Sequence, residues 1–407
     1  MTRKIKELFI KYVRSHLLWK AAIFLAKIYH HCIKIFRIFS FGQFQFGPPS
    51  VRDKPTKQRY ERYNTNVVSA KKAIYKEIYP PNQVNKKLPK TIEKRIHPTL
   101  LKYISEPQHE QFVVNIPEGK VIGTYTNITP DYKILRDSAG YKGFNTDTNY
   151  YTYKIYLGKA TKIHENLAVL SGDDTFKNYH HRLIFGLPKY HLFQKSGFKI
   201  DKYITDYSFP FHKEAINALG IKEEQIIIAK KTAYIEAENL ILGSTTTIHG
   251  NIPKRAIDFL KNTFLEDHKP KKTGKRLYIS RITNRKVIND EEISSYLHKF
   301  GFIKYDSLDN LSIKEQAELF NSAEIIIGIH GAALTNAVFC KEGTKIIEIF
   351  HEKTVRGHYY CIANACELDY YYLLGKSIKD NRKMEMDRDM YIPIEKIIKT
   401  LELAGIK

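Results

Sequence analysis

The sequence contains little cysteine and neither of two common glycine-rich phosphate motifs. Its four cysteines form no Cys-x-x-Cys pair, and none has a histidine partner at metal-ligand spacing, so neither a disulfide framework nor a zinc site is indicated. The absence of GxGxxG disfavours a nicotinamide-dependent dehydrogenase, and the absence of GxxxxGK(S/T) argues against a P-loop NTPase. We expect the cysteines to be free thiols in a reducing compartment.

Long uncharged hydrophobic runs are also missing from the N-terminal region. Residues 1–40 carry nine Lys or Arg and one acid, Glu7, and lysines interrupt every apolar stretch before it reaches the roughly 20 residues that a membrane span needs. The persistent charge also disfavours a signal peptide. Two alternatives stay open for this predicted basic helix: it lies on an anionic membrane surface, or it packs on the rest of the protein.

Acidic residues are scarce relative to basic ones. The 66 Lys and Arg exceed the 43 Asp and Glu, which gives a net charge of +23. Such a charge favours an acidic partner, whether nucleic acid, an anionic membrane surface, a nucleotide-bearing substrate or an acidic polysaccharide. A hydrophobic fraction of 43% and 407 residues are enough for two or three globular domains.

Changes in composition along the chain predict its domain organisation. Residues 41–100 are rich in lysine and proline, and "LEDHKPKKTGK" (265–275) is a polar, charged boundary between two folded regions. The predicted order is a basic helix, a Lys-rich connector, an N-terminal acceptor-side domain, a C-terminal donor-binding domain and a C-terminal helix, over residues 1–40, 41–100, 101–268, 269–385 and 386–407.

Strands and helices alternate clearly in the second half of the sequence. "RLYIS" (276–280), "GFIKYD", "EIIIGI" and "TKIIEIF" read as strands. Asn289 precedes a helix with an acidic first turn, and Ser312 with Glu315 has capping-box spacing. "EIIIGI" has the uninterrupted apolar character of a strand that is buried on both faces. This alternation predicts a doubly wound α/β domain.

Small residues follow the most hydrophobic of these strands. In an open parallel sheet, ligands bind beyond the carboxyl ends of the strands, and His330-Gly331-Ala332-Ala333 lies at such an end. A loop with so few side-chain atoms exposes backbone amides, and "ALTNAVF" can begin a helix whose first N–H groups favour an anion. The alternative is a tight turn without a ligand.

Two arginines and a glutamate accompany this loop. Arg281 and Arg285 follow the first strand of the same predicted sheet, and guanidinium groups bind phosphate in a bidentate manner. Glu348 interrupts the apolar strand "KIIEIF", where an ionised carboxylate needs a partner. A ribose diol or a buried salt bridge would satisfy it equally well.

Several of these segments together resemble glycosyltransferase family 61, whose bacterial members are usually described as capsular polysaccharide biosynthesis proteins. The similar segments include "YISRITNR", "LSIKEQAELFNSAEIIIGIHGAALTNAVF" and "IIEIF", and "NYHHRLIFGLPKY" is similar to the family's "NYYHWL…LPR". The resemblance covers about residues 120–375. It implies a GT-B architecture, in which two Rossmann-like domains face each other across a cleft, and an inverting reaction with a nucleotide-sugar donor.

The resemblance also implies roles for individual residues. Arg281 and Arg285 would contact the pyrophosphate, and Glu348 would bind the ribose. The remaining donor-binding residues lie in the loop and the helix after it: His330, Gly331, Ala332, Ala333 and Asn336.

Inverting transfer needs a base that removes the acceptor hydroxyl proton. His181 matches the family's histidine and is our candidate, because a neutral imidazole titrates near working pH. Asp173 and Asp174 are the reserve candidates, and they could equally cap the next helix. Arg182 stands where the family usually has Trp, and Lys189 where it often has Arg, which bears on acceptor recognition.

The sequence offers one metal-binding pattern, and we do not expect it to function. Asp387-Arg388-Asp389 has the DxD form of metal-dependent transferases of another fold, but it lies in a charged segment where such triplets arise by chance. In a GT-B enzyme, arginines and amides would stabilise the leaving group in place of a metal. We therefore expect neither a metal nor another cofactor.

These observations lead to three hypotheses. The first is an inverting glycosyltransferase that moves a sugar from a nucleotide-sugar donor, which we expect to be UDP-linked, to a surface polysaccharide, capsule or glycolipid acceptor. This enzyme would lie on the cytoplasmic face of the membrane through residues 1–40. The second is a nucleic-acid- or polyanion-binding protein, although no nucleic-acid-binding motif is present. The third is an inactive sugar-binding scaffold, which would tolerate loss of His181.

Overall fold

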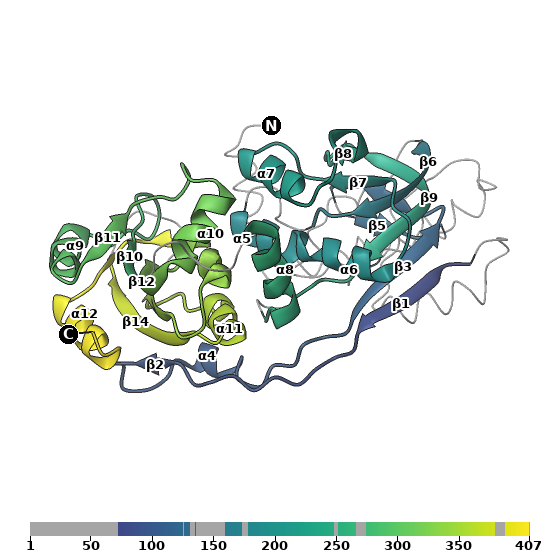
Figure 1. The fold of residues 1–407 in the computed structure, drawn as a ribbon. Coiled ribbons are helices and arrows are strands. Elements are labelled where there is room, and N and C mark those ends of the chain that lie inside the picture. The colour runs from purple at the N-terminus through teal and green to yellow at the C-terminus, as the bar shows by residue number, and fades with distance from the viewer. Residues whose placement is uncertain are drawn as a thin grey trace, which may run out of the picture.

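The computed structural model describes residues 72–124, 126–130, 135, 159–172, 178–247, 251–265, 274–378 and 387–406 (Figure 1). The predicted basic helix, most of the connector, Asp173 and Asp174 lie outside the described residues. Within the described ranges, none of the helices combines the length and the apolar character that crossing a membrane requires.

The second half of the chain forms a mainly parallel sheet, as the alternating pattern predicts. Its strands run in the order β11-β10-β12-β13-β14-β15, and β2 from the N-terminal part pairs with β14. Neighbours are parallel from β11 to β14, whereas β15 is antiparallel to β14. The bounds are β2 (Lys90–Thr91), β10 (Lys275–Ile279), β11 (Phe302–Tyr305), β12 (Ala323–Ile329), β13 (Lys345–His351), β14 (Asp369–Ser377) and β15 (Met390–Tyr391).

The first half of the chain forms a mixed sheet in the order β1-β3-β9-β6-β7-β8, with β4 and β5 added beside β9. The pairs β9–β6, β6–β7 and β7–β8 are parallel. The pairs β1–β3, β3–β9 and β4–β9 are antiparallel. The bounds are β1 (Ile74–Tyr79), β3 (Gln111–Pro117), β4 (Lys120–Ile122), β5 (Thr126–Ile128), β6 (Thr161–Val169), β7 (Lys202–Thr205), β8 (Ile226–Ile228) and β9 (Tyr234–Gly243).

Helices fill the space between the two sheets and share one hydrophobic core. On the first-sheet side these are α5 (Tyr179–His181), the π-helix η2 (Arg182–Gly186), α6 (Pro188–Ser196), α7 (Pro210–Ala218) and α8 (Lys254–Phe264). On the other side are α10 (Ile313–Asn321), the 3-10 helix η4 (Ala332–Phe339) and α11 (His358–Ala365). Buried side chains from both sets, such as Phe185 and Phe339, belong to a single cluster, so the two sheets are joined by packing (Figure 1).

Further helices complete the fold outside this layer. Helices α9 (Asp290–His298) and α12 (Ile394–Leu403) cover the other face of the second sheet through Leu297 and Leu401. Two short helices, α4 (Pro98–Leu101) and the 3-10 helix η3 (Glu223–Gln225), lie in connections.

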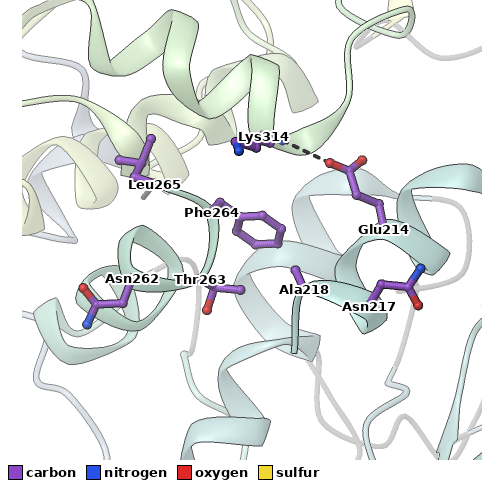
Figure 2. Close-up of a pocket in the computed structure, with 8 residues that line it drawn as sticks. All are labelled: Glu214, Asn217, Ala218, Asn262, Thr263, Phe264, Leu265 and Lys314. Carbon is purple, nitrogen blue, oxygen red and sulfur yellow. Dashed lines mark hydrogen bonds between the residues drawn. The ribbon is translucent and has the colours of Figure 1, made fainter. Parts of the chain in front are cut away.

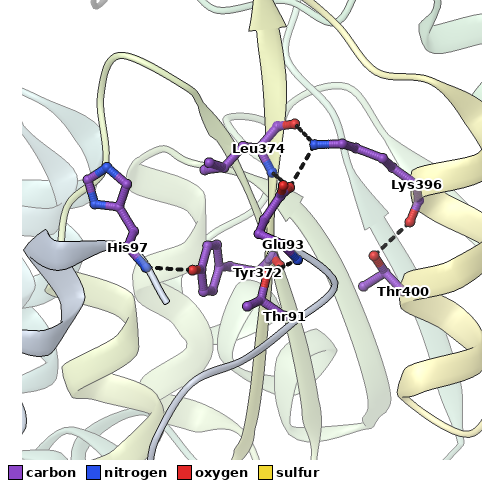
Figure 3. A network of polar contacts seen from close by, with 7 residues as sticks. All are labelled: Thr91, Glu93, His97, Tyr372, Leu374, Lys396 and Thr400. Atoms are coloured by element: carbon purple, nitrogen blue, oxygen red, sulfur yellow. Dashed lines mark hydrogen bonds and ion pairs between the residues drawn. The ribbon is translucent and has the colours of Figure 1, made fainter. Parts of the chain in front are cut away.

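The segment between β1 and β3 crosses from the first sheet to the second and returns. Figure 3 shows how its middle part is tied to β14 and α12. The Glu93 carboxylate accepts hydrogen bonds from Lys396 Nζ (2.7 Å) and from the Leu374 amide (3.1 Å), and the His97 amide donates to the Tyr372 hydroxyl (2.8 Å). This crossing segment fastens the two halves together, and Leu100 of α4 also packs into the shared core.

Local signals in the sequence set several helix ends. Ser312 and Glu315 form the predicted capping box at the start of α10, and Gly301 adopts the left-handed conformation (φ 76°) after α9. Asn289 is at the predicted N-cap of α9, but its side chain makes no cap hydrogen bond. It instead bonds to the main chain of Ile392, so a tertiary contact replaces the expected cap.

The α/β class with parallel strands is therefore confirmed. The segment after His330 forms a helix as predicted, and this helix is of the 3-10 type.

Candidate active site

The second sheet reverses its strand order between β10 and β12, and the predicted donor residues follow these two strands. Numbered along the chain from β10, the order of the five parallel strands is 2-1-3-4-5. The connection after β10 leads to β11 on one side of it, whereas β12 and the later strands lie on the other side. In such sheets the crevice outside the carboxyl ends at the reversal binds ligands. Arg281 and Arg285 follow β10, and His330 and Gly331 follow β12, so the structure brings these four residues to the carboxyl edge of the sheet at the reversal.

Arg281 lies across the loop that follows β12. Its NH1 donates to the His330 carbonyl (3.3 Å) and its Nε to the Asn284 carbonyl (2.9 Å). A Cβ atom on Gly331 would overlap Arg281 NH1, so the missing side chain at Gly331 makes room for this guanidinium. Burial, together with the charge of Arg285, lowers the pKa of Arg281 to about 10, and it stays protonated at neutral pH.

Arg285 has a left-handed backbone conformation (φ 62°), which is uncommon for a residue with a Cβ atom. Neighbouring main-chain contacts fix the turn: the Arg285 amide donates to the Asp387 carbonyl (3.3 Å) and the Lys286 amide to Asp389 Oδ1 (2.8 Å). The Nε of Arg285 is buried and has no hydrogen-bond partner among the described residues. An unused guanidinium donor therefore lies beside Arg281.

These contacts also explain the DxD triplet. Asp387 and Asp389 stabilise the turn at Arg285: the Asp387 carbonyl and an Asp389 carboxylate oxygen accept hydrogen bonds from main-chain amides of the turn. No group of three or more His, Cys, Asp or Glu side chains suited to a metal occurs in the described part of the chain.

His330 is held by a buried pair, Glu348 and Tyr370. His330 Nδ1 lies 2.5 Å from Glu348 Oε1, and the Tyr370 hydroxyl donates to Glu348 Oε2 at 2.5 Å. Glu348 is fully buried, and both of its oxygens have partners, so the structure favours an internal partner over a ribose for this carboxyl. Burial raises the pKa of Glu348 well above its usual value.

Three arginines surround the His330 imidazole. Burial, followed by their charges, holds the pKa of His330 well below its ordinary value, so the ring is neutral. The three are Arg285, Arg281 and Arg356. Arg356 was missed by the sequence analysis because it lies in a loop after β13 without any motif; only the strand-end rule, applied to β13 as well, could have found it.

The predicted donor residues Ala332 and Ala333 are accessible to a ligand, whereas Asn336 is not. Ala332 and Ala333 are partly exposed at the start of η4, where the first amides of a helix have no partner within it. Asn336 is fully buried, and its amide donates to Gln316 Oε1 (2.7 Å) while its Oδ1 accepts from the Tyr179 hydroxyl (2.7 Å). Asn336 thus joins η4 to α5 and α10 and has no polar atom free for a ligand.

The predicted base lies on the helix that touches this loop. His181 is 9% exposed on α5. Its neighbour His180 contacts Thr335 Oγ1 of η4 through Nδ1 (2.8 Å) and His358 of α11 through Nε2 (3.4 Å). Both ring nitrogens of His180 are engaged, so His180 connects the two halves of the chain and His181 stays the candidate base. No local pattern in the sequence singles out His180, because its role depends on tertiary contacts.

Arg182 and Lys189, the two residues near His181 that differ from the usual family residues, are both buried. Arg182 has no solvent exposure, and its guanidinium nitrogens lack hydrogen-bond partners among the described residues. Burial lowers the pKa of Arg182 to about 10, and Asp206 partly opposes this change. Burial also lowers the pKa of Lys189 to about 8. The π-helix thus begins with a buried guanidinium next to the candidate base, and a buried lysine follows on α6. Such π-helices often occur at functional positions.

The family model described as Glycosyltransferase 61 matches residues 68–347 of this sequence. The chain belongs to glycosyltransferase family 61. The matched region runs from before β1 into β13 and includes Arg281, Arg285, His330 and His181. Glu348 directly follows its last residue.

Curated relatives of this family 61 member include plant enzymes. The α-1,3-arabinosyltransferase XAT3 of Oryza sativa subsp. japonica is 37% identical over 82 residues, which are 20% of this chain and 14% of that protein. A β-1,2-xylosyltransferase of Arabidopsis thaliana is 33% identical over 98 residues, or 21% of this chain and 18% of that protein. The similarity thus spans less than a fifth of the length of each relative.

Proposed function

We propose that this family 61 member transfers a sugar from a nucleotide-sugar donor, with uridine diphosphate as the leaving group, to a saccharide acceptor. The observation that carries the proposal is the cluster of cationic groups at the strand-order reversal, where Arg281 and Arg285 meet the His330 loop. A diphosphate that leaves in the reaction develops negative charge, and fixed cationic donors stabilise that charge.

Each donor residue has a distinct part in this proposal. Arg281 and Arg285 bind the pyrophosphate, with Arg285 Nε as the donor that has no partner among the described residues. The first amides of η4, at Ala332 and Ala333, add main-chain donors. Arg356, exposed at the same crevice, adds a further positive charge.

The protonation of the His330 pair determines which nitrogen meets the donor. Since the pKa of Glu348 is raised and that of His330 is lowered, we infer that Glu348 is protonated and donates to His330 Nδ1. The neutral ring then carries its own proton on Nε2. His330 is a hydrogen-bond donor to a phosphate oxygen in this arrangement, and Glu348 with Tyr370 positions it.

The acceptor side completes an inverting mechanism in a GT-B arrangement. His181 removes the proton from the acceptor hydroxyl, and that oxygen attacks the anomeric carbon while the nucleoside diphosphate departs from the opposite face. Placement of His181 on α5, which packs against η4 through His180, supports this role. Asp173 and Asp174 stay reserve candidates on sequence grounds alone.

A calorimetric titration tests the donor proposal. The panel contains UDP, UDP-glucose, UDP-N-acetylglucosamine and, because of the names of the relatives, UDP-xylose and UDP-arabinose, with GDP- and CMP-sugars for comparison. Arg285→Ala should raise the dissociation constant of the UDP compound that binds about 30-fold, since a charged hydrogen bond contributes roughly 2 kcal/mol. Arg276→Ala is the matched control, because it removes a guanidinium at the opposite end of β10. No binding of any nucleotide would overturn the proposal and favour a polyanion-binding protein.

Gly331→Ala tests the geometry of the loop. The added methyl displaces the Arg281 guanidinium, and we expect about 30-fold weaker UDP binding, the equivalent of one charged contact. The Tm should stay near the wild-type value, because the methyl meets the flexible end of a side chain. In an Arg281→Ala background the same change should have no further effect; an equal loss in both backgrounds would show that Arg281 is not the group displaced.

We also propose that the acceptor is an acidic or lipid-linked saccharide of a surface polysaccharide, capsule or glycolipid, and that the protein works at the cytoplasmic face of a membrane. The net charge of +23 and the basic residues 1–40 support this. Deletion of residues 1–40 should move the protein from the membrane fraction to the soluble fraction, and unchanged partitioning would contradict the anchoring.

A further inference from the structure

A long groove runs along α8, outside the crevice that holds the arginines. It consists of two adjoining cavities of about 580 and 560 Å³, which share Ala218, Asn262 and Thr263. Figure 2 shows the first cavity, where Asn262 and Thr263 of α8 face Asn217 and Ala218 of α7 beneath the start of α10. The second cavity continues along α8 toward the end of β1.

Aromatic rings line the second cavity. Tyr79, Tyr190, His191 and Phe259 form its wall. The Tyr79 hydroxyl bonds to His191 Nε2 at 2.8 Å, and the Phe259 ring lies 5.6 Å from that of His191 and 6.4 Å from that of Tyr190, between centroids. A sugar ring has apolar C–H faces and a rim of hydroxyls, and it can pack on such rings while its hydroxyls bond to polar neighbours.

Polar groups for those hydroxyls occur along the whole groove. The amides of Gln194, Asn217 and Asn262 and the hydroxyl of Thr263 contribute to its walls. Gln194, Asn217 and Asn262 are exposed, so a ligand can reach them without a rearrangement of the fold.

The residues that line the groove carry a net positive charge. Lys195, Arg255 and Lys314 line it. Two acids also line it: Asp258 pairs with Lys254 (3.1 Å), and Glu214 accepts from the Lys314 amide (3.1 Å) and keeps its charge. The lining therefore has three cationic groups against two carboxylates. The groove therefore favours an anionic ligand.

Arg255 gives the aromatic cavity a specific cationic group. Its guanidinium lies over the Tyr79 ring at 4.2 Å, and its Nε donates to Gln111 Oε1 at 2.9 Å. Its NH2 is buried and has no hydrogen-bond partner in the described ranges. Burial lowers the pKa of Arg255, and an anionic group beside it would offset that cost.

We propose that this groove binds an acidic oligosaccharide segment of the acceptor glycan. Its role as an acceptor site rests on the proposed function. Two cavities in a row suit several sugar units, and the carboxylates of such a chain match Lys195, Arg255 and Lys314. The groove reaches the start of α10, and Gln316 on the same helix holds Asn336 of the loop helix η4. The acceptor chain is thus held by the helices that also support the donor crevice.

Binding of acidic oligosaccharides of two lengths tests the proposal. The probes are digalacturonic acid, octagalacturonic acid and neutral maltooctaose, titrated against the full-length protein. The wild type should bind the acidic octamer more tightly than either of the others. Because it reverses two groove charges, Lys195→Glu with Lys314→Glu should weaken the octamer about tenfold or more, and Phe259→Ala should weaken it as well. Lys299→Glu with Lys399→Glu is the matched control, since both lysines are exposed on the second half of the chain.

The possible outcomes separate this inference from the proposed function. No octamer binding to the wild type, or equal losses in the groove and control variants, would overturn the groove. Displacement of the octamer by single-stranded DNA of equal charge with the same affinity would overturn its saccharide specificity. UDP binding should be unchanged in the groove variants. If UDP does not bind at all while the octamer depends on the groove, the transferase proposal fails and the saccharide site stands.

Discussion

His181→Ala is expected to lower kcat for sugar transfer by about 100- to 10,000-fold, the usual contribution of a general base. The histidine lies on α5, which contacts the donor loop through His180, and it is nearly buried at 9% exposure. Its removal takes away a proton acceptor and leaves the arginine crevice in place. The dissociation constant of UDP should therefore change little, and the loss should appear in kcat.

Two other histidines serve as controls for His181. His164→Ala removes an exposed histidine on β6 in the same half of the chain, and transfer should be retained. His180→Ala breaks the contacts to Thr335 and His358, so it should lower Tm and weaken the donor as well. An unchanged kcat in His181→Ala, with the protein folded, would exclude His181 as the base and direct attention to Asp173 and Asp174.

The order of secondary structure in the second half could be read from the sequence because local signals agree with the fold. The apolar run of β12 and the capping box of α10 are each encoded within a few residues. The partner of each strand is not encoded locally. Residues 90–91 extend the second sheet as β2 by pairing with β14, although 281 positions separate Thr91 from its partner Tyr372. Nothing in the sequence of residues 90–91 indicates this pairing.

In the candidate site, too, some residues could be predicted from local sequence and others depend on strand pairing. Arg281, Arg285 and His330 could be predicted because each follows a strand, and parallel strands bring their carboxyl ends to one edge. Glu348 was recognised as unusual, but its partner depends on strand register. Tyr370 faces Ile346 on the neighbouring strand, two residues before Glu348, and therefore lies on the same face. Only the pairing of β13 with β14 reveals that contact.

Glu348→Ala is expected to destabilise the protein by about 3–4 kcal/mol, since it leaves a cavity and two buried groups without partners. Glu348→Gln should cost far less. If Glu348 is protonated, an amide can donate to His330 Nδ1 and accept from Tyr370 just as the acid does. The two variants thus separate the loss of a hydrogen-bonded side chain from the loss of a charge. Denaturant unfolding gives the free energy of unfolding of each variant. The UDP affinity of each variant then shows whether His330 is still positioned to bind the donor.

The pH dependence of stability tests the same protonation state. Burial raises the pKa of Glu348 in the folded protein, so the folded state holds a proton that the unfolded state releases at the ordinary glutamate pKa of about 4.3. Stability from this group is complete below that value and is lost as the pH rises through the raised pKa. Glu348→Gln has no such proton, and the lowered pKa of His330 affects both proteins alike. The wild type should therefore lose stability relative to Glu348→Gln as the pH rises. The opposite trend would mean that Glu348 is ionised and paired with a protonated His330, and His330 would then meet the donor as a cation.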